Sequence, residues 1–192
     1  MSTEPHNRSF LQRLKRFYFF KRAKIKERRS DWRGLAALAM SWAKTESYDG
    51  EAWYLLGVAY GQLGDHEREV AAYKRAVEVG PFAAGAWTNL GAAYWDLRRH
   101  EDAEMAYRKA LQLTPHDTKA YSGLIHCLLA QEKKAEAAGV VEQLFQLGLR
   151  SNLGYPGPIV SVQVHGILQA LDPELAQAYS TRLDAIISKL TS

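Results

Sequence analysis

Histidine and cysteine side chains are common metal ligands and nucleophiles in proteins, and this chain has six histidines and one cysteine. The histidines are His6, His66, His100, His116, His126 and His165. None has the spacing of a metal-binding pair with another histidine or with Cys127. Cys127 falls inside a predicted helix and is expected to be a small buried apolar side chain, with the adjacent His126 on another part of the helix surface. The spacing therefore predicts no metal site and no cysteine–histidine nucleophile.

The other polar patterns in the sequence have structural explanations. His66 and His100 each stand at the start of a predicted helix, and we interpret them as turn and capping residues. The acidic run 101–104 lies at a helix N-terminus, where the helix dipole favours negative charge. Glycines within the predicted helices are isolated, so they form no phosphate-binding loop. We therefore predict a protein that is not an enzyme, has no catalytic residues and binds no cofactor.

A sequence repeat with a strict period runs through the middle of the chain. One copy has Trp53, Leu56, Gly57, Tyr60, Tyr73, Ala76 and Pro81, and the next has Trp87, Leu90, Gly91, Tyr94, Tyr107, Ala110 and Pro115. A third copy keeps only the apolar character, at Tyr121, Leu124, Ile125, Leu128, Ala137, Val141 and Leu144. The period, from Trp53 to Trp87, predicts units that bury their apolar faces against their neighbours in a stacked array. His66 and His100 occupy the same position in successive copies.

Each copy of the repeat has the pattern of two helices. Apolar residues at three- and four-residue spacing predict a helix from Glu51 to about Gln62, and a turn follows at Gly64. A second helix ends before Pro81, because proline cannot continue the hydrogen-bond ladder. The helices that follow are predicted over residues 84–97, 100–113, 118–130 and 134–148.

The same register extends weakly towards the N-terminus. It places Phe19, Ala23 and Trp42 at the positions of Trp53, Gly57 and Ala76. Residues 8–28 could therefore be the first helix of a degenerate repeat, and residues 31–45, with Asp31 as N-cap, its second helix.

The register is lost after residue 148. Residues 151–157 have the composition of a loop, and a helix is predicted from Pro158 through Leu171. Asp172, Pro173 and Glu174 are a strong start signal for a last helix. Terminal units of repeat arrays are usually atypical, so we interpret residues 151–192 as a loop with capping helices.

The signature of the repeat resembles that of tetratricopeptide-repeat proteins. The units at 50–83 and 84–117 match strongly, the unit at 118–150 matches loosely, and the segments 1–30 and 31–49 match only by register. The resemblance implies an all-α fold, a right-handed superhelical array of antiparallel helix pairs (an α-solenoid). It would have about ten helices, including a basic N-terminal helix and C-terminal capping helices. The signature residues are then expected to be packing residues.

The resemblance also implies a concave groove, lined by the first helix of each unit, that takes a peptide or helix of a partner protein. The expected groove residues are Tyr54, Val58, Gln62, Thr88, Trp95, Asp96, Lys119, Ser122 and His126. Tyr54 and Trp95 are the largest of them, and aromatic residues with a polar group are common hot spots of binding. Trp95 could instead pack against the following unit.

Residues 1–30 carry positive charge that the rest of the chain lacks. They hold ten Lys or Arg against two acidic residues, whereas the remainder holds 15 basic and 19 acidic residues. The expected basic surface comprises Arg13, Lys15, Arg16, Lys21, Arg22, Lys24, Lys26, Arg28 and Arg29. The apolar residues Phe10, Leu11, Leu14, Phe17, Tyr18 and Ile25 fall on one face of the same predicted helix.

That apolar face leaves several interpretations open. It could dock on the helix that contains Trp32 and Trp42, which is the interpretation we favour, or it could lie in an anionic membrane surface. Nucleic-acid binding is disfavoured because no recognition motif accompanies the basic residues. A disordered tail is the remaining alternative.

The composition is that of a soluble domain, with 192 residues, 47% hydrophobic and 24% charged. A single cysteine, the lack of an 18-residue apolar run and the lack of a secretory signal favour a cytoplasmic location, with contact to the inner face of a membrane left open. We predict a non-catalytic adaptor or scaffold that binds a protein partner in the groove and assembles a larger complex. The alternatives are a small chaperone for a hydrophobic client and a tether that binds a membrane surface or nucleic acid through the basic helix.

Overall fold

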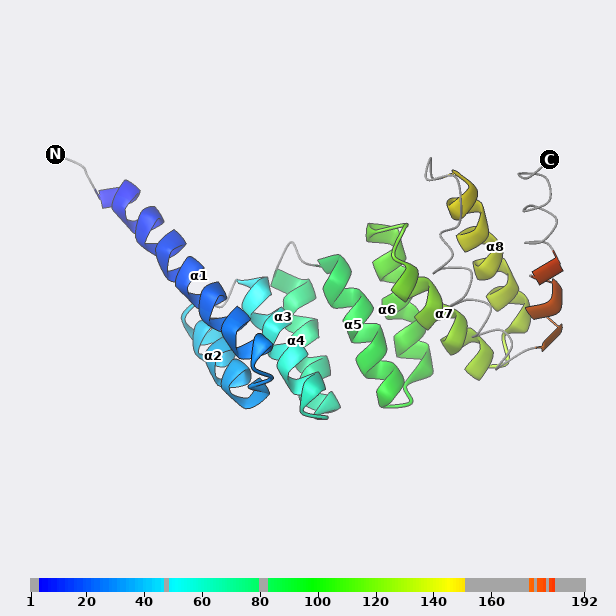
Figure 1. The fold of residues 1–192 in the computed structure, drawn as a ribbon, viewed down its shortest axis with the longest axis horizontal. Coiled ribbons are helices and arrows are strands. Elements are labelled where there is room, and N and C mark those ends of the chain that lie inside the picture. Colours follow the sequence, from blue (N-terminus) through cyan, green and yellow to red (C-terminus); the bar gives the residue numbers. More distant parts are fainter. Residues whose placement is uncertain are drawn as a thin grey trace. The chain divides into compact units, whose positions relative to one another are not determined.

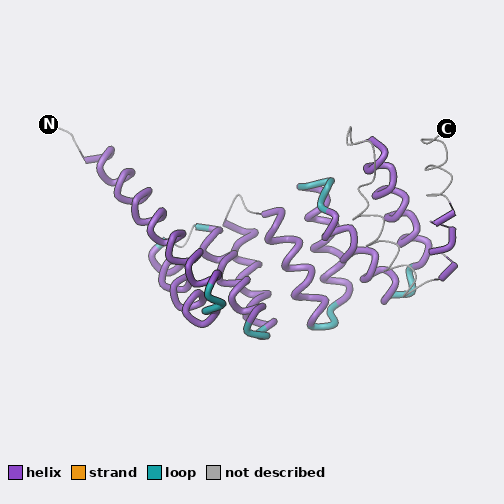
Figure 2. The backbone as a smooth tube through the Cα atoms, viewed as in Figure 1, coloured by secondary structure: helices purple, strands orange, loops and turns teal. Residues whose placement is uncertain are grey.

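The structure is a computed structural model of the 192-residue chain. It describes residues 4–46, 49–79, 83–150, 173–174, 176–178 and 180–181. All regular secondary structure in these residues is helical (Figure 2). The chain divides into two compact units, Met1–Leu97 and Arg98–Ser192, and each is described separately.

The first unit consists of helices that follow one another along the chain (Figure 1). They are α1 (Glu4–Arg28), α2 (Trp32–Thr45), α3 (Gly50–Gln62), α4 (His66–Val79) and α5 (Ala83–Asp96). Each of these helices packs against the next one. The C-terminal half of α1 lies along α2, and its N-terminal half extends beyond the other helices of the unit (Figure 1).

Aspartate side chains begin two helices of the first unit. Asp31 accepts a hydrogen bond from the backbone N–H of Gly34 at 2.9 Å, and Asp49 accepts one from that of Glu51 at 3.1 Å. These bonds satisfy backbone donors that have no partner within the first helical turn. The prediction of Asp31 as an N-cap is confirmed.

The signature residues of the repeat fill the space between helices. Leu56, Tyr60, Tyr73 and Ala76 are all buried. Gly57 lies directly against the Tyr73 ring, and a Cβ atom at this position would come within 2.6 Å of the Tyr73 Cε1 atom. Glycine therefore permits the close approach of α3 and α4. The prediction that these are packing residues is confirmed.

The turn inside each helix pair recurs with the same period as the sequence. Ser30, Gly64, Arg98 and Glu132 follow one another at intervals of one repeat, and their φ angles are 53°, 74°, 57° and 60°. A residue in the left-handed conformation commonly follows a helix, because it lets the last carbonyl groups find hydrogen-bond donors. Since Ser30 occupies this position between α1 and α2, the backbone pattern of the repeat begins at α1.

The second unit contains α6 (His100–Leu113), α7 (Thr118–Ala130) and α8 (Lys134–Arg150). Helix α6 packs on α7, and α7 packs on α8. Asp117 begins α7 by accepting hydrogen bonds from the backbone N–H groups of Lys119 and Ala120. Cys127 is fully buried in the core of this unit, and its burial raises the pKa of the thiol to about 12. The prediction that Cys127 is a buried apolar side chain is confirmed.

An all-α fold, with consecutively packed helices within each unit, is confirmed for the described part of the chain. Helix α1 begins at Glu4, before the predicted start at residue 8. Residues 173–174, 176–178 and 180–181 are helical, in agreement with the start signal at Asp172, whereas the loop and helix predicted over 151–171 lie outside the described residues. Among the helices that are described, none combines the length and the apolar character needed to cross a bilayer.

Candidate functional site

The first unit has a hollow of about 590 Å³ on the side formed by α1, α3 and α5. Its lining residues are Phe20, Ala23, Lys24, Glu27, Glu51, Tyr54, Leu55, Ala84 and Gly85. Small side chains from α5 form one wall, and the aromatic rings of Phe20 and Tyr54 project from α1 and α3. The hollow is therefore apolar with charged side chains around it, as ligand pockets in proteins commonly are.

Tyr54 is held in place by hydrogen bonding. The Asn89 side-chain amide donates to the hydroxyl oxygens of Tyr54 and Tyr73, each at 3.1 Å. The two tyrosine rings lie 5.7 Å apart with a tilt of 57°. Because Tyr73 is buried and fixed in the core, Asn89 joins Tyr54 to a rigid part of the unit.

The charged side chains at the hollow are largely paired with one another. Arg16 lies 3.3 Å from the carboxylate of Glu51 and 3.6 Å from that of Asp49. Lys24 lies 3.9 Å from the carboxylate of Glu27. Burial raises the pKa of Glu51, and the nearby Arg16 opposes this shift. The hollow has no strong net charge, so it suits a partner segment that is mainly apolar.

Of the residues predicted for the groove in the first unit, Tyr54 lines the hollow. Val58 is half-buried and Gln62 is exposed, and neither belongs to the lining. Thr88 is buried, with 7% of the residue exposed, and its hydroxyl donates to the backbone carbonyl of Ala84 at 3.2 Å.

The other predicted groove residues lie elsewhere. Trp95 is half-buried and does not line the hollow. Asp96 is exposed at the end of α5 and faces His66 of α4. Lys119, Ser122 and His126 are on α7 in the second unit. Lys119 is exposed, Ser122 and His126 are half-buried, and burial lowers the pKa of His126.

Two lining residues that were not predicted for the groove could have been found from the register. Phe20 stands one repeat period before Tyr54, and Lys24 stands one period before Val58. Applying the groove positions to the N-terminal helix would therefore have selected both. Helix α1 supplies part of this site just as the first helix of an ordinary repeat does.

Comparison with known families agrees with this architecture. Profiles described as tetratricopeptide repeat match residues 50–81 and 84–117. The chain carries tetratricopeptide repeats. No curated protein sequence matches it.

Solved structures share the fold of these repeats. A crystal structure of MamA has a TM-score of 0.67 and 18% identity, and the match covers 88% of this chain and 97% of that chain. MamA from Desulfovibrio magneticus RS-1, residue 41 to the end, has a TM-score of 0.67 and 17% identity over 91% of this chain and 96% of that one. A putative kinesin light chain of Podosopora anserina with TPR-like repeats has a TM-score of 0.69 and 13% identity over 91% and 95%. At these identities the likeness shows the fold alone.

The N-terminal helix packs against the repeats through a different face from the one we predicted. Phe19 and Ala23 are buried, and the Phe19 ring stacks on Trp42 at 4.8 Å with an interplanar angle of 16°. Phe17 and Tyr18 of the predicted docking face are 60% and 58% exposed. Docking on the Trp42 helix therefore occurs, but the apolar face inferred from helical periodicity stays largely exposed, with Leu14 and Tyr18 at the edge of the contact with α2. The repeat register, which placed Phe19 and Ala23 at packing positions, identified the buried face correctly.

Three residues of the predicted basic surface pair with a carboxylate, and most of the surface is exposed. Arg16 pairs with Glu51, Lys24 lines the hollow beside Glu27, and Lys26 pairs with Asp31 at 2.7 Å. The remaining members are exposed on α1 or directly after it. They are Arg13, Lys15, Lys21, Arg22, Arg28 and Arg29. Cations thus flank the exposed apolar side chains of this helix.

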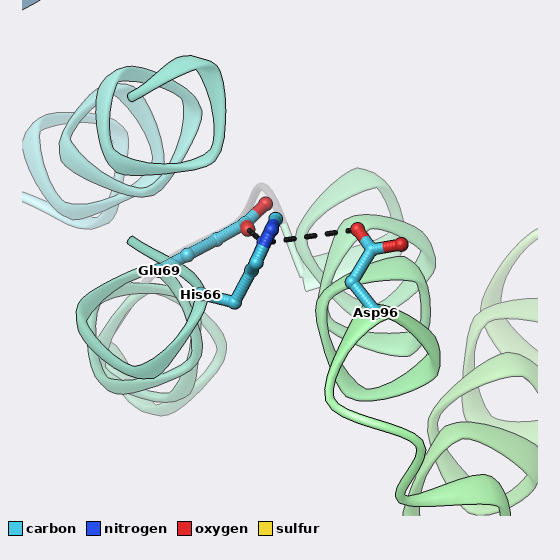
Figure 3. A group of neighbouring side chains, drawn as sticks. All are labelled: His66, Glu69 and Asp96. Atoms are coloured by element: carbon cyan, nitrogen blue, oxygen red, sulfur yellow. Dashed lines mark hydrogen bonds and ion pairs between the residues drawn. The ribbon is translucent and has the colours of Figure 1, made fainter. Parts of the chain in front are cut away.

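A second polar group in the first unit consists of His66, Glu69 and Asp96 (Figure 3). The His66 Nδ1 atom lies 2.9 Å from Glu69 Oε2 and 3.7 Å from Asp96 Oδ2. The hydrogen bond to Glu69 is the main cause that raises the pKa of His66, and burial raises the pKa of Glu69. Sequence spacing interpreted His66 only as a turn and capping residue, because Asp96 is distant from it in the chain.

Proposed function

We propose that the first unit binds a segment of a partner protein by taking one large apolar side chain into the hollow between α1, α3 and α5. The tetratricopeptide-repeat fold supports a role in protein–protein interaction in general. The observation that supports this particular site is the hollow itself, in which Phe20 and Tyr54 flank the small residues Ala84 and Gly85. Space beside fixed aromatic rings is what an apolar anchor of a partner needs.

The fixed position of Tyr54 favours binding. Because Asn89 already holds the Tyr54 hydroxyl, little side-chain freedom is lost when a partner packs against the ring. The paired charges of Lys24 with Glu27 and of Arg16 with Glu51 would lie at the rim. Rim charges contribute to the orientation of a partner more than to affinity. The protein would act as an adaptor, with chemistry left to its partners.

Substitution of Gly85 gives the sharpest test of this site. A Cβ atom at Gly85 would meet only Tyr54 Cε2, at 3.9 Å, so the Gly85→Leu side chain can enter the hollow without disturbing the helix packing. Proteins retained by the tagged wild-type chain from an extract of its source cells are identified, and their binding to variants is then measured. We expect Gly85→Leu and Tyr54→Ala to weaken binding of the partner at least about tenfold.

The matched control is Gly139→Leu, because Gly139 is also an exposed helical glycine with no atom near its Cβ position. This variant is expected to bind the partner as the wild type does. Circular dichroism should show the same helix content for all three variants. Equal capture of the partner by Gly85→Leu and wild type would refute the hollow as the binding site.

We propose as a second function that the exposed face of α1 binds an anionic membrane surface. Leu14, Phe17, Tyr18 and Ile25 are all at least 40% exposed, although they are apolar. Exposed Lys and Arg residues lie between and beside them on the same helix. A helix lying in the plane of a bilayer has this combination, because apolar side chains enter the boundary of the acyl chains and cations contact lipid phosphates.

Vesicle binding tests this second function. We expect the chain to sediment with phosphatidylglycerol vesicles and to bind phosphatidylcholine vesicles much more weakly. Replacing Lys21 by Glu reverses one charge and is expected to weaken binding at least about fivefold. Replacing Phe17 by Ser should weaken it as well, whereas Met105→Ser, which removes a similarly exposed apolar side chain from α6, should not. Equal vesicle binding by the Phe17 and Met105 variants would contradict the assignment, and so would a preference for RNA over lipid.

A further inference from the structure

We propose that His66, Glu69 and Asp96 form a binding site for a divalent transition-metal ion, with Zn²⁺ as the ion that suits the ligands best. Each residue offers one ligand atom, and these atoms all lie within 4.8 Å of one another. Figure 3 shows that the imidazole of His66 lies between the two carboxylates, which come from the first turn of α4 and the end of α5. Among the described residues no other group of this kind occurs.

The distances suit a tetrahedral ion. Bonds of about 2.1 Å from zinc to nitrogen and oxygen place the ligand atoms about 3.4 Å apart. The separations of 2.9 Å and 3.7 Å from His66 Nδ1 to the two carboxylates lie on either side of this value. The third separation, between the carboxylates of Glu69 and Asp96, is at most 4.8 Å, so the half-exposed Asp96 side chain would move towards Glu69 to complete the coordination. One imidazole with two carboxylates favours zinc over calcium or magnesium, which prefer oxygen ligands alone.

Glu69 distinguishes the proposed metal site from the equivalent positions in the other repeats. It is 8% exposed, whereas the other copies have fully buried apolar residues at the same register position, namely Leu35, Ala103 and Ala137. An alanine is thus sufficient for packing at this position. A carboxylate there carries a cost of desolvation, which the hydrogen bond to His66 offsets in part and a bound cation would offset further.

The neighbouring helix provides space for the Glu69 carboxylate. A Cβ atom at Gly61 would lie 2.5 Å from Glu69 Oε1. At the register position of Gly61 the two following repeats have Trp95 and Leu129, and the N-terminal copy has Glu27, all with much larger side chains. A glycine and a glutamate in this repeat thus stand where the two following repeats have a large apolar residue and an alanine. The difference adds a buried ligand atom, and the packing of the other repeats shows that the fold does not need a carboxylate at this position.

The site is open on one side. The side chains of His66 and Asp96 are 32% and 50% exposed, whereas that of Glu69 is 11% exposed. An ion can therefore arrive from solvent and keep one or more water ligands. Three carboxylates, those of Asp65, Glu69 and Asp96, act on His66, so the local charge also favours a cation.

Calorimetric titration of the metal-free full chain with ZnCl₂ at neutral pH tests the proposal, and Co²⁺ absorption in the visible range reports the coordination geometry. We expect one strongly bound ion per chain, a raised unfolding midpoint, and the absorption bands of tetrahedral cobalt. Glu69→Gln and Asp96→Asn are each expected to weaken zinc binding at least about tenfold. Both variants keep the size of the side chain, and circular dichroism verifies that they fold.

The controls separate this site from general attraction of zinc to acids or histidines. Glu67→Gln removes an exposed carboxylate from the same turn of α4, and His116→Gln removes an exposed histidine from a loop of the second unit. Both should bind zinc within about twofold of the wild type. The proposal is overturned if the wild type takes up no zinc, or if Glu69→Gln and Asp96→Asn bind it as tightly as the wild type. In that case the three residues are an ion-pair network between α4 and α5 and nothing more.

Discussion

Replacing Phe19 by alanine should destabilise the N-terminal helix pair, whereas replacing Phe17 by alanine should not. The two residues are two positions apart on α1, and Phe19 is 3% exposed whereas Phe17 is 60% exposed. Deleting a buried phenylalanine ring costs about 3 to 5 kcal/mol of unfolding free energy. The stacking of Phe19 on Trp42 and its edge-on contact with Phe20 at 5.0 Å place the expected loss within that range. Substitution of an exposed residue usually changes stability by less than about 0.5 kcal/mol.

Urea unfolding followed by circular dichroism measures the global loss, and native-state amide exchange locates it. Because each repeat contacts only its neighbours, the end of an array can open before the rest. We therefore expect faster exchange in α1 and α2 of Phe19→Ala, with α4 little changed. If Phe17→Ala is as destabilising as Phe19→Ala, then α1 docks through the face predicted from helical periodicity, and the assignment of its exposed face to a membrane surface fails with it.

Further expectations concern a turn, a thiol and a histidine. Gly64→Ala should cost about 1 kcal/mol of unfolding free energy in urea titration, because the φ angle of +74° strains any residue with a side chain. No atom lies near the added methyl group, so a clash does not contribute. A neutral result would mean that this turn is not left-handed. Cys127 should react with a thiol reagent at about pH 8 only as fast as the chain unfolds, since burial raises the pKa of the thiol to about 12. Fast labelling of the folded chain would instead show that the core is open to solvent. The hydrogen bond to Glu69 raises the pKa of His66 above its ordinary 6.5, so the stability it contributes is complete below that pH and is lost as pH rises through the folded-state pKa. In metal-free buffer His66→Gln should therefore flatten the fall in unfolding midpoint between about pH 6 and about pH 8, and an unchanged slope would count against this linkage.

The spacing of residues within short stretches of the sequence was enough to predict the helices. The repeat of Trp53, Gly57, Tyr73 and their counterparts sets which side chains pack, because residues three or four apart share a helix face. The turn at Gly64 was readable because glycine adopts the left-handed conformation at no steric cost. Arg98 and Glu132 take the same conformation without any glycine signal, so only the period itself could have indicated them.

The face of α1 that packs against α2 could not be predicted from the apolar residues of α1. Leu14, Phe17 and Tyr18 form a more continuous apolar face than Phe19 and Ala23, and burial of the larger face was the natural expectation. The packing of α2 instead selects the face with a small residue, since Ala23 permits close approach of the helices and Phe19 reaches Trp42. Which face of α1 is buried depends on the shape of the neighbouring helix, and that shape cannot be inferred from the sequence of α1 alone.

Amino-acid order alone specifies that this chain is a helical repeat, because both the helix period and the longer period of the repeat are local properties of the sequence. The sites depend on contacts between residues that are far apart in the chain. Asn89 of α5 reaches Tyr54 of α3, and Asp96 of α5 reaches His66 of α4. Such pairs form only after neighbouring helices have packed at a particular distance and rotation, so the candidate sites became visible in the folded unit and not in the sequence.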